Sequence, residues 1–244
     1  MRLALALVLG GCGFHVAAGA SDDDGTPSDG PAPPVDVPGE VIGACGSPKI
    51  WQADFTADPR TLDVNGDGVL DWAIRQGMPM PGVMQNGVWT EPAPPIAALD
   101  TQPKQNFTTR TKIRVRMQND VAGGTYGAVF WINVGYGDAD FAPIWIDLNK
   151  QPSGSQDLTL YTKNPALTPI TLATASGLGA GMVDVVLDLD PAAHVLFLQV
   201  AALPTVGPIS YTEIPTGGTD DRWATITAFS TQSEFDLVRI EVCP

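Results

Sequence analysis

The chain has few basic residues. It contains 13 lysines and arginines against 27 aspartates and glutamates, so its 244 residues carry a formal net charge of −14. Such a charge repels phosphate backbones, and we expect no nucleic acid partner. Anionic headgroups are repelled for the same reason, so contact with a membrane would have to come through a lipid attached to the chain.

The chain also lacks the residue patterns of common hydrolases. No G-x-S-x-G or H-E-x-x-H segment occurs. Only His194 lies in the region expected to fold, and it stands at a turn, where a surface histidine is more usual than a general base. Retaining glycosidases need two carboxylates about 5 Å apart, and none of the five glutamates belongs to a paired-carboxylate strand motif. We therefore expect no catalytic activity.

Helical periodicity is absent too, and strict alternation takes its place. Apolar and polar residues alternate over 112–118, 143–149 and 183–189, which indicates strands with one buried face. A turn after Asp190 leads into 194–202, so this pair predicts a hairpin. Further strands are expected at 50–56, 72–76, 125–136, 156–163, 169–173, 222–230 and 235–242. Many short strands separated by turns predict an all-β sandwich or barrel over residues 45–244.

The first 44 residues have a different composition. An apolar run follows Arg2 and ends at Leu9-Gly10-Gly11-Cys12, which is typical of a secretory signal over residues 1–11 whose removal leaves Cys12 first. The run is too short for a stable membrane anchor. An ordinary signal peptide with a chance cysteine is the alternative. Residues 12–44 are rich in Asp, Gly, Pro and Ser, which predicts a disordered tether.

Three cysteines are present, and two of them bracket the expected domain. In an exported protein Cys45 and Cys243 are best interpreted as a disulfide. Two buried free thiols are the alternative. A disulfide requires α-carbons within about 7 Å. The cysteine count therefore predicts that the first and last segments of the domain lie side by side.

Residues 63–71 have the pattern D-x-N-x-D-G-x-x-D. Calcium prefers six to eight hard oxygen ligands, and this spacing directs several oxygens at one centre. The expected ligands are the side chains of Asp63, Asn65 and Asp67, the carbonyl of Val69, and Asp71 directly or through water. An acidic turn without metal is the alternative.

Strand alternation also predicts a polar and aromatic outer face. If the aliphatic residues of 112–118, 125–136 and 143–149 point inward and these strands are neighbours, one face combines Arg114, Arg116, Trp131, Asn133, Trp145 and Asp147. Aromatic rings together with planar hydrogen-bonding groups are typical of sugar sites, so this face is a candidate glycan site. The alternative is that both tryptophans are buried, as tryptophan usually is.

Three resemblances add to these inferences. The segment ending at Cys12 resembles the lipobox of bacterial lipoproteins, which implies a diacylglycerol on Cys12 and a place in the bacterial cell envelope; Gly13 after the cysteine implies the outer membrane. The loop 63–71 resembles the calcium loops of EF-hands, dockerins and thrombospondin type 3 repeats. It departs from them at position twelve, where Ile74 replaces the bidentate glutamate. The site would therefore have to borrow a carboxylate, with Asp54 and Asp58 as the nearest candidates, or lose affinity.

The hairpin 182–200 and the closing strand 235–242 resemble the laminin-G and concanavalin A-like jelly-roll sandwich. In that superfamily the first and last strands are neighbours, which agrees with a bridge between Cys45 and Cys243. The resemblance implies a lipid-anchored, calcium-stabilised, lectin-like module that binds carbohydrate. A structural or adhesive surface protein that binds another protein is the second hypothesis, and a glycan hydrolase or lyase is the third.

Overall fold

A computed structural model describes residues 45–74, 82–90, 97–102, 109–119, 128–133, 144–163, 168–211, 223–228 and 233–244. The signal segment, Cys12 and the tether up to residue 44 lie outside these residues, so they stay predictions. No helix in the described part of the chain has the length and apolar character needed to cross a membrane. The described chain contains strands and one short 3-10 helix, η1 (Pro59–Thr61).

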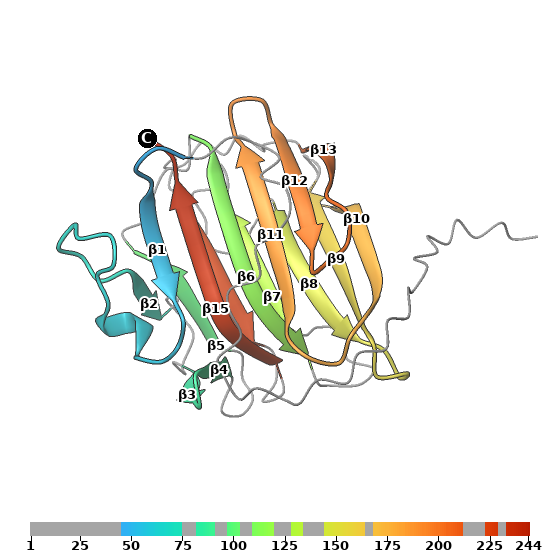
Figure 1. The fold of residues 1–244 in the computed structure, drawn as a ribbon, viewed down its shortest axis with the longest axis horizontal. Coiled ribbons are helices and arrows are strands. Elements are labelled where there is room, and N and C mark those ends of the chain that lie inside the picture. Colours follow the sequence, from blue (N-terminus) through green and yellow to red (C-terminus); the bar gives the residue numbers. More distant parts are fainter. Residues whose placement is uncertain are drawn as a thin grey trace, which may run out of the picture. The chain divides into compact units, whose positions relative to one another are not determined.

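The strands form two antiparallel sheets, which Figure 1 shows one in front of the other. Sheet A has the order β13 (Val206–Ser210), β12 (Val195–Val200), β11 (Val183–Asp190), β6 (Thr111–Asn119), β15 (Ser233–Val242), β4 (Val88–Thr90) and β3 (Val83–Gln85), with β1 (Lys49–Ala53) also paired to β15. Sheet B has the order β10 (Pro169–Leu178), β9 (Gln156–Lys163), β8 (Ile144–Lys150), β7 (Ala128–Asn133), β14 (Trp223–Ala228), β5 (Ala97–Thr101) and β2 (Trp72–Ile74).

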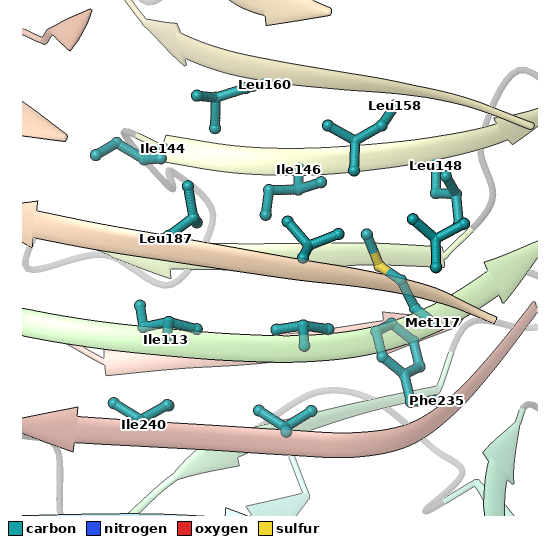
Figure 2. Close-up of a cluster of buried hydrophobic side chains, with 14 of the residues drawn as sticks. Ile113, Met117, Ile144, Ile146, Leu148, Leu158, Leu160, Leu187, Phe235 and Ile240 are labelled. Atoms are coloured by element: carbon teal, nitrogen blue, oxygen red, sulfur yellow. The ribbon is translucent and has the colours of Figure 1, made fainter. Parts of the chain in front are cut away.

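Alternation places the apolar side of each sheet against the other sheet. In β6, every second residue from Thr111 to Asn119 is buried. Figure 2 shows the two sets of buried side chains meeting between the sheets: Ile113, Met117, Leu187, Phe235 and Ile240 from sheet A, and Ile144, Ile146, Leu148, Leu158 and Leu160 from sheet B. Each such side chain stabilises the fold by about 1.5–3 kcal/mol through burial. This common core confirms the predicted all-β sandwich.

One strand needs a local irregularity to keep its apolar residues inward. In β15, both Asp236 and Leu237 lie opposite Arg116, which makes a β-bulge. The extra residue resets the alternation, so that Phe235 and Val238 are both fully buried although three positions separate them. Asp236 is left beside Arg116 on the outer side of sheet A.

The predicted hairpin is confirmed, because β11 and β12 pair antiparallel through the turn after Asp190. The strand expected at 156–163 coincides with β9. Four strands were not predicted, namely β3, β4, β5 and β13. β3 and β4 have three residues each, too few for an alternating pattern to appear, and β13 contains Gly207 and Pro208, which are uncommon in strands.

The predicted disulfide is confirmed. Cys45 and Cys243 are bonded with their α-carbons 5.4 Å apart. The first strand, β1, pairs antiparallel with the last strand, β15, from Lys49 opposite Val242 to Ala53 opposite Val238. The two ends of the domain therefore lie side by side, as the cysteine count predicts.

Candidate functional site

The six residues of the predicted glycan face do not share one surface. Arg114 and Arg116 belong to β6 in sheet A, whereas Trp131, Asn133, Trp145 and Asp147 belong to β7 and β8 in sheet B. The condition that these strands be neighbours is therefore not met. Because the two sheets bury their inner faces against each other, their outer faces lie on opposite sides of the sandwich. The prediction has to be corrected to two separate faces.

The outer face of sheet A is a set of ion pairs between neighbouring strands. Arg114 donates from Nε to Asp184 Oδ1 on β11 at 2.9 Å, and Asp184 raises the pKa of the Arg114 guanidinium. Arg116 pairs with Asp236 on β15. Arg110, just before β6, binds Asp188 with Nη2–Oδ2 at 2.6 Å. The predicted arginines are thus engaged by carboxylates of their own sheet.

The outer face of sheet B carries aromatic residues at the same level on neighbouring strands. The register places Trp131 on β7 opposite Trp145 on β8, and Trp145 opposite Tyr161 on β9. The rings of Trp145 and Tyr161 are stacked, with centroids 5.0 Å apart and planes inclined by 18°. Both residues are half-buried. The side chains of Trp131 and Asn133 lie outside the described part of the structure.

The stacking of Trp145 and Tyr161 limits how a ligand can use them. Two nearly parallel rings at this spacing are in direct contact, so no sugar ring fits between them. A ligand would instead contact their solvent-facing edges. We name Trp145 and Tyr161 together the aromatic pair.

Acceptor groups lie beside the aromatic pair on β8 and β9. Asp147 is opposite Thr159 in the register, and Asn149 is opposite Asp157. Asp147 is only 5% exposed although it belongs to the outer face. Asn149 Oδ1 is buried and has no hydrogen-bond partner among the described residues. Asp157 Oδ1 accepts from the backbone N–H of Gly177 at 3.0 Å. We name Asp147, Asn149 and Asp157 the acceptor cluster.

The sequence prediction named Asp147 and Trp145 but missed Asp157 and Tyr161 as site residues. Their signal was available in the alternation of 156–163, because the core residues Leu158 and Leu160 leave Asp157 and Tyr161 on the outer side. A second buried acid, Asp100 on β5, is 6% exposed and belongs to the same outer face. Three strand spacings, about 14 Å, separate its strand from that of Asp147, which is too far for a pair of glycosidase carboxylates.

The acidic loop 63–71 connects β1 of sheet A to β2 of sheet B and is held by its own side chains. Asp63 Oδ1 accepts from the N–H groups of Gly66 at 2.8 Å and Asp67 at 3.1 Å, and its Oδ2 accepts from Gly68 N–H at 2.9 Å. Gly66 and Gly68 have φ of 72° and 82°, a region open to glycine without strain. Asp67 forms an ion pair with Lys49 Nζ on β1 at 2.8 Å, which lowers the pKa of Asp67.

Asp71 closes this loop from a fully buried position. Its Oδ2 accepts from Val64 N–H at 2.9 Å and its Oδ1 from Asn65 Nδ2 at 2.6 Å. Burial raises the pKa of Asp71 to about 6, and Asp63 and Asp67 add to the shift, while the Val64 hydrogen bond and Lys49 oppose it. The backbone carbonyl of Asp71 accepts from Gln102 N–H at 2.6 Å, which ties the loop to the end of β5.

The structure brings the five predicted calcium ligands into one loop. Their donor chemistry fits calcium, since four are side-chain oxygen donors and a carboxylate has about four acceptor positions. However, no three His, Cys, Asp or Glu side chains in the described ranges are grouped so as to hold a metal ion. The carboxylates face backbone N–H groups, and Lys49 stands at Asp67 where a cation would stand.

No family model matches the chain, and no curated protein matches its sequence. Among solved structures, the chain is similar to the carbohydrate recognition domain of Emp46p in its potassium-bound form, with a TM-score of 0.51 and 12% identity over 80% of this chain and 97% of that chain. The metal-free form of the same domain has a TM-score of 0.51 and 12% identity, over 78% of this chain and 98% of that chain. The Ca2+/Man2-bound exoplasmic/lumenal domain of VIP36 has a TM-score of 0.47 and 10% identity, over 75% of this chain and 85% of that chain.

At such low identity these likenesses concern the fold. The described domain has the antiparallel, concanavalin A-like jelly-roll architecture of lectin carbohydrate recognition domains. The predicted fold class is therefore confirmed.

Proposed function

We propose that this chain is a carbohydrate-binding module, attached to a bacterial envelope by a lipid on Cys12, and that it binds glycan on the outer face of sheet B. The observation that carries the proposal is the aromatic pair beside the acceptor cluster, on a domain with the fold of carbohydrate recognition domains. Rings and planar polar groups are complementary to the C–H and O–H groups of a sugar.

The outer face of sheet A is a poorer candidate for ligand binding. On sheet A the guanidinium groups already have carboxylate partners, so a ligand would have to break ion pairs in order to bind there. On sheet B the two residues of the aromatic pair are half-buried, so part of each ring is open to a ligand.

The test is a glycan array followed by calorimetry of the tightest oligosaccharide. We expect Tyr161→Ala and Trp145→Ala to weaken binding about tenfold, since an aromatic contact contributes roughly 0.5–1.5 kcal/mol beyond the area that it buries. Trp145→Phe should retain part of the affinity. Asp184→Asn on sheet A is the matched control and should bind as the wild type. Equal binding by the wild type and both alanine variants, all folded, would refute this site.

The other two hypotheses have their own outcomes in the same experiment. A chain that binds no glycan on the array but captures a protein partner through the same face would favour the adhesive function. Asp147 and Asp157 are diagonal neighbours in the sheet, about 7–8 Å apart, and inverting glycosidases separate their carboxylates by about 6.5–9.5 Å. Release of reducing ends from a bound oligosaccharide would therefore favour hydrolysis over pure binding.

Calcium belongs to the proposal as a structural ion in the loop 63–71. Binding would require the Lys49 ammonium to leave Asp67, and Asp63, Asn65, Asp67, Val69 and Asp71 would then provide the oxygens. We expect calcium to raise the melting temperature, because an ion that binds only the native state stabilises it. Asp67→Ala should abolish this shift. Identical melting curves in calcium and in chelator would eliminate the ion.

The lipid anchor rests on the segment ending at Cys12, and the outer-membrane location rests on Gly13 after it. Mass spectrometry of the membrane fraction should find a diacylglycerol-modified cysteine at the mature N-terminus. Cys12→Ser should release the protein from the membrane. A wild-type chain that stays soluble after signal removal would contradict the anchor without affecting the glycan site.

A further inference from the structure

Sheet B ends in a long strand that is paired on one side. β10 has ten residues and forms the margin of sheet B in Figure 1, where its partner among the described strands is β9 alone. The strands that end the two sheets elsewhere are shorter, since β13 has five residues and β2 and β3 have three each. Alternate residues of a strand direct their N–H and C=O groups to opposite sides. The outer side of β10 therefore presents backbone donors and acceptors that no described strand uses.

Residues 169–175 are the part of β10 that is available for further pairing. Near the end of the strand, the register with β9 shifts, and Gly177 N–H donates to Asp157 Oδ1 at 3.0 Å. That end is therefore bound within the chain. The register also shifts at Leu172, but the strand is continuous there and Leu172 packs against the core. We name residues 169–175 the open edge.

The open edge has none of the charged residues that commonly protect the edges of sheets. Its sequence is Pro-Ile-Thr-Leu-Ala-Thr-Ala, and Ile170 is 43% exposed. The chain carries −14 in total, so two copies repel each other as whole molecules. At the open edge an uncharged strand would meet an identical uncharged strand, and no like charges would lie opposite each other. This edge is therefore a place where a second copy of the chain can approach.

The open edge lies next to the proposed glycan face. Ala173 and Ala175 pack against the core, so Thr174 between them points to the outer side of sheet B, where it is exposed. The register continues this outer side across the sheet, from Thr171 to the aromatic pair on β9 and β8. The aromatic pair is thus one and two strands away from the open edge.

We propose that two copies of this chain join through their open edges, which pair antiparallel and continue sheet B from one copy into the other. Antiparallel pairing of a strand with its own copy has a two-fold axis perpendicular to the sheet, and such an interface is self-complementary. The axis keeps the outer sides of both copies on one side of the dimer. The two β9 strands are then three strand spacings apart, about 14 Å, and the two β8 strands about 24 Å.

The dimer would present two aromatic pairs to the same glycan-covered surface. Two sites that bind together raise the apparent affinity without any new contact. This consequence rests on the proposed function, whereas the pairing of the open edges does not. Because the paired segments are short, we expect the affinity between copies to be on the order of micromolar to millimolar.

The test is sedimentation velocity of the Cys12→Ser chain, in which a lipid cannot bring copies together. We expect the fraction of dimer to rise with concentration up to about 1 mM. Thr171→Lys with Thr174→Lys, the double-lysine variant, should stay monomeric because like charges meet at the contact. The corresponding double-aspartate variant should also stay monomeric, and an equimolar mixture of the two should dimerise. Val206→Lys with Ser210→Lys on β13 is the matched control and should dimerise as the parent chain.

Two further measurements locate the contact and its consequence. Amide hydrogens of residues 169–175 should exchange more slowly as the concentration of the parent chain rises, and those of the double-lysine variant should not. On a glycan array printed at a low and a high density, the parent chain should gain about tenfold or more in apparent affinity at high density. The double-lysine variant should bind equally at both densities.

The failures are distinguishable. A parent chain that stays monomeric at about 1 mM would refute the dimer. A dimer that persists in both charged variants, or that the β13 control also loses, would refute the open edge as the contact. A dimer without any gain at high glycan density would refute the shared orientation of the two glycan faces. An array without any bound glycan would refute the proposed function and leave the sedimentation result to decide the dimer.

Discussion

The outer faces of sheet A and sheet B come from strands of the same alternating pattern, yet their polar side chains are arranged in opposite ways. On sheet A, Arg114 and Arg116 are bound by carboxylates from the strands on either side. On sheet B, Asn149 has a buried oxygen without a partner, and Asp157 uses one oxygen of two. Asp236 Oδ1 on sheet A is likewise buried without a partner among the described residues, so the faces differ in their contents: ion pairs on sheet A, stacked rings and acceptor groups on sheet B.

The difference follows from which strands are neighbours. β6 supplies the basic residues and lies between β11 and β15, which supply Asp184, Asp188 and Asp236. Opposite charges across neighbouring strands contribute roughly 0.2–1 kcal/mol each. In sheet B, β8 and β9 place acceptors opposite one another and rings opposite one another. The same inward alternation thus produces one face of ion pairs and one face of stacked rings and acceptor groups.

The largest difference between an effect on stability and an effect on glycan binding is expected on removal of the disulfide. Cys45→Ser with Cys243→Ser removes the link between the ends of β1 and β15 in sheet A. We expect a loss of about 2–4 kcal/mol in the free energy of unfolding. Urea denaturation measures it, and calorimetry of the folded variant should give an unchanged glycan affinity. A loss of binding in the folded variant would mean that the two faces are coupled.

A smaller effect of the same kind is expected for Asp188→Ala. Asp188 is 8% exposed and holds the partly buried Arg110 through two hydrogen bonds. Its removal takes two charge-assisted hydrogen bonds from a partly buried guanidinium, at a cost of about 1–3 kcal/mol in stability. Asp157→Asn on sheet B is the matched comparison and should reduce binding more than stability. If both variants lose stability equally, the two faces do not differ in role.

The sequence predicts those features of the two faces that depend on residues close together in the chain, and it does not predict those that depend on pairing between distant segments. Alternation within one strand is a local property, and it correctly places Ile113 and Val115 inward with Arg114 outward. The disulfide is predictable because Cys45 and Cys243 are the only two cysteines of the expected domain, so they allow one pairing there. The sheet to which a strand belongs depends on pairing with segments far along the chain, as when β6 joins β15 more than 100 residues later. For that reason Arg114 and Trp145 were assigned to one face.

The acidic loop between the sheets provides a pH-dependent effect of intermediate size. The pKa of buried Asp71 is raised from 3.8 to about 6, so between these values the folded chain keeps a proton that the unfolded chain releases. The stability contributed by Asp71 is therefore complete below the unfolded pKa and is lost as the pH rises towards 6. Asp54, Asp58 and Asp67 have lowered pKa values and contribute with the opposite sign.

The measurement is the difference between wild type and Asp71→Asn in urea unfolding, made in chelator over the range from pH 4 to pH 6. Asparagine cannot titrate, so the wild type should lose stability relative to the variant as the pH rises. The absolute stability of Asp71→Asn is less informative, since its amide cannot accept from both Val64 N–H and Asn65 Nδ2. Parallel pH curves for the two proteins would show that Asp71 is not the buried titrating group.

The smallest effect is expected for Arg116→Gln, and it decides between the two assignments of the glycan site. The Arg116 side chain is 46% exposed and its ion pair with Asp236 lies on the surface of sheet A, so its loss should cost less than about 1 kcal/mol. A site that combined Arg116 with Trp145 would lose glycan affinity in this variant. Because sheet A and sheet B face opposite sides, we expect calorimetry to give the wild-type affinity, while Tyr161→Ala in the same series loses about tenfold. A matching loss in Arg116→Gln would return the glycan site to sheet A and would contradict the separation of the two faces.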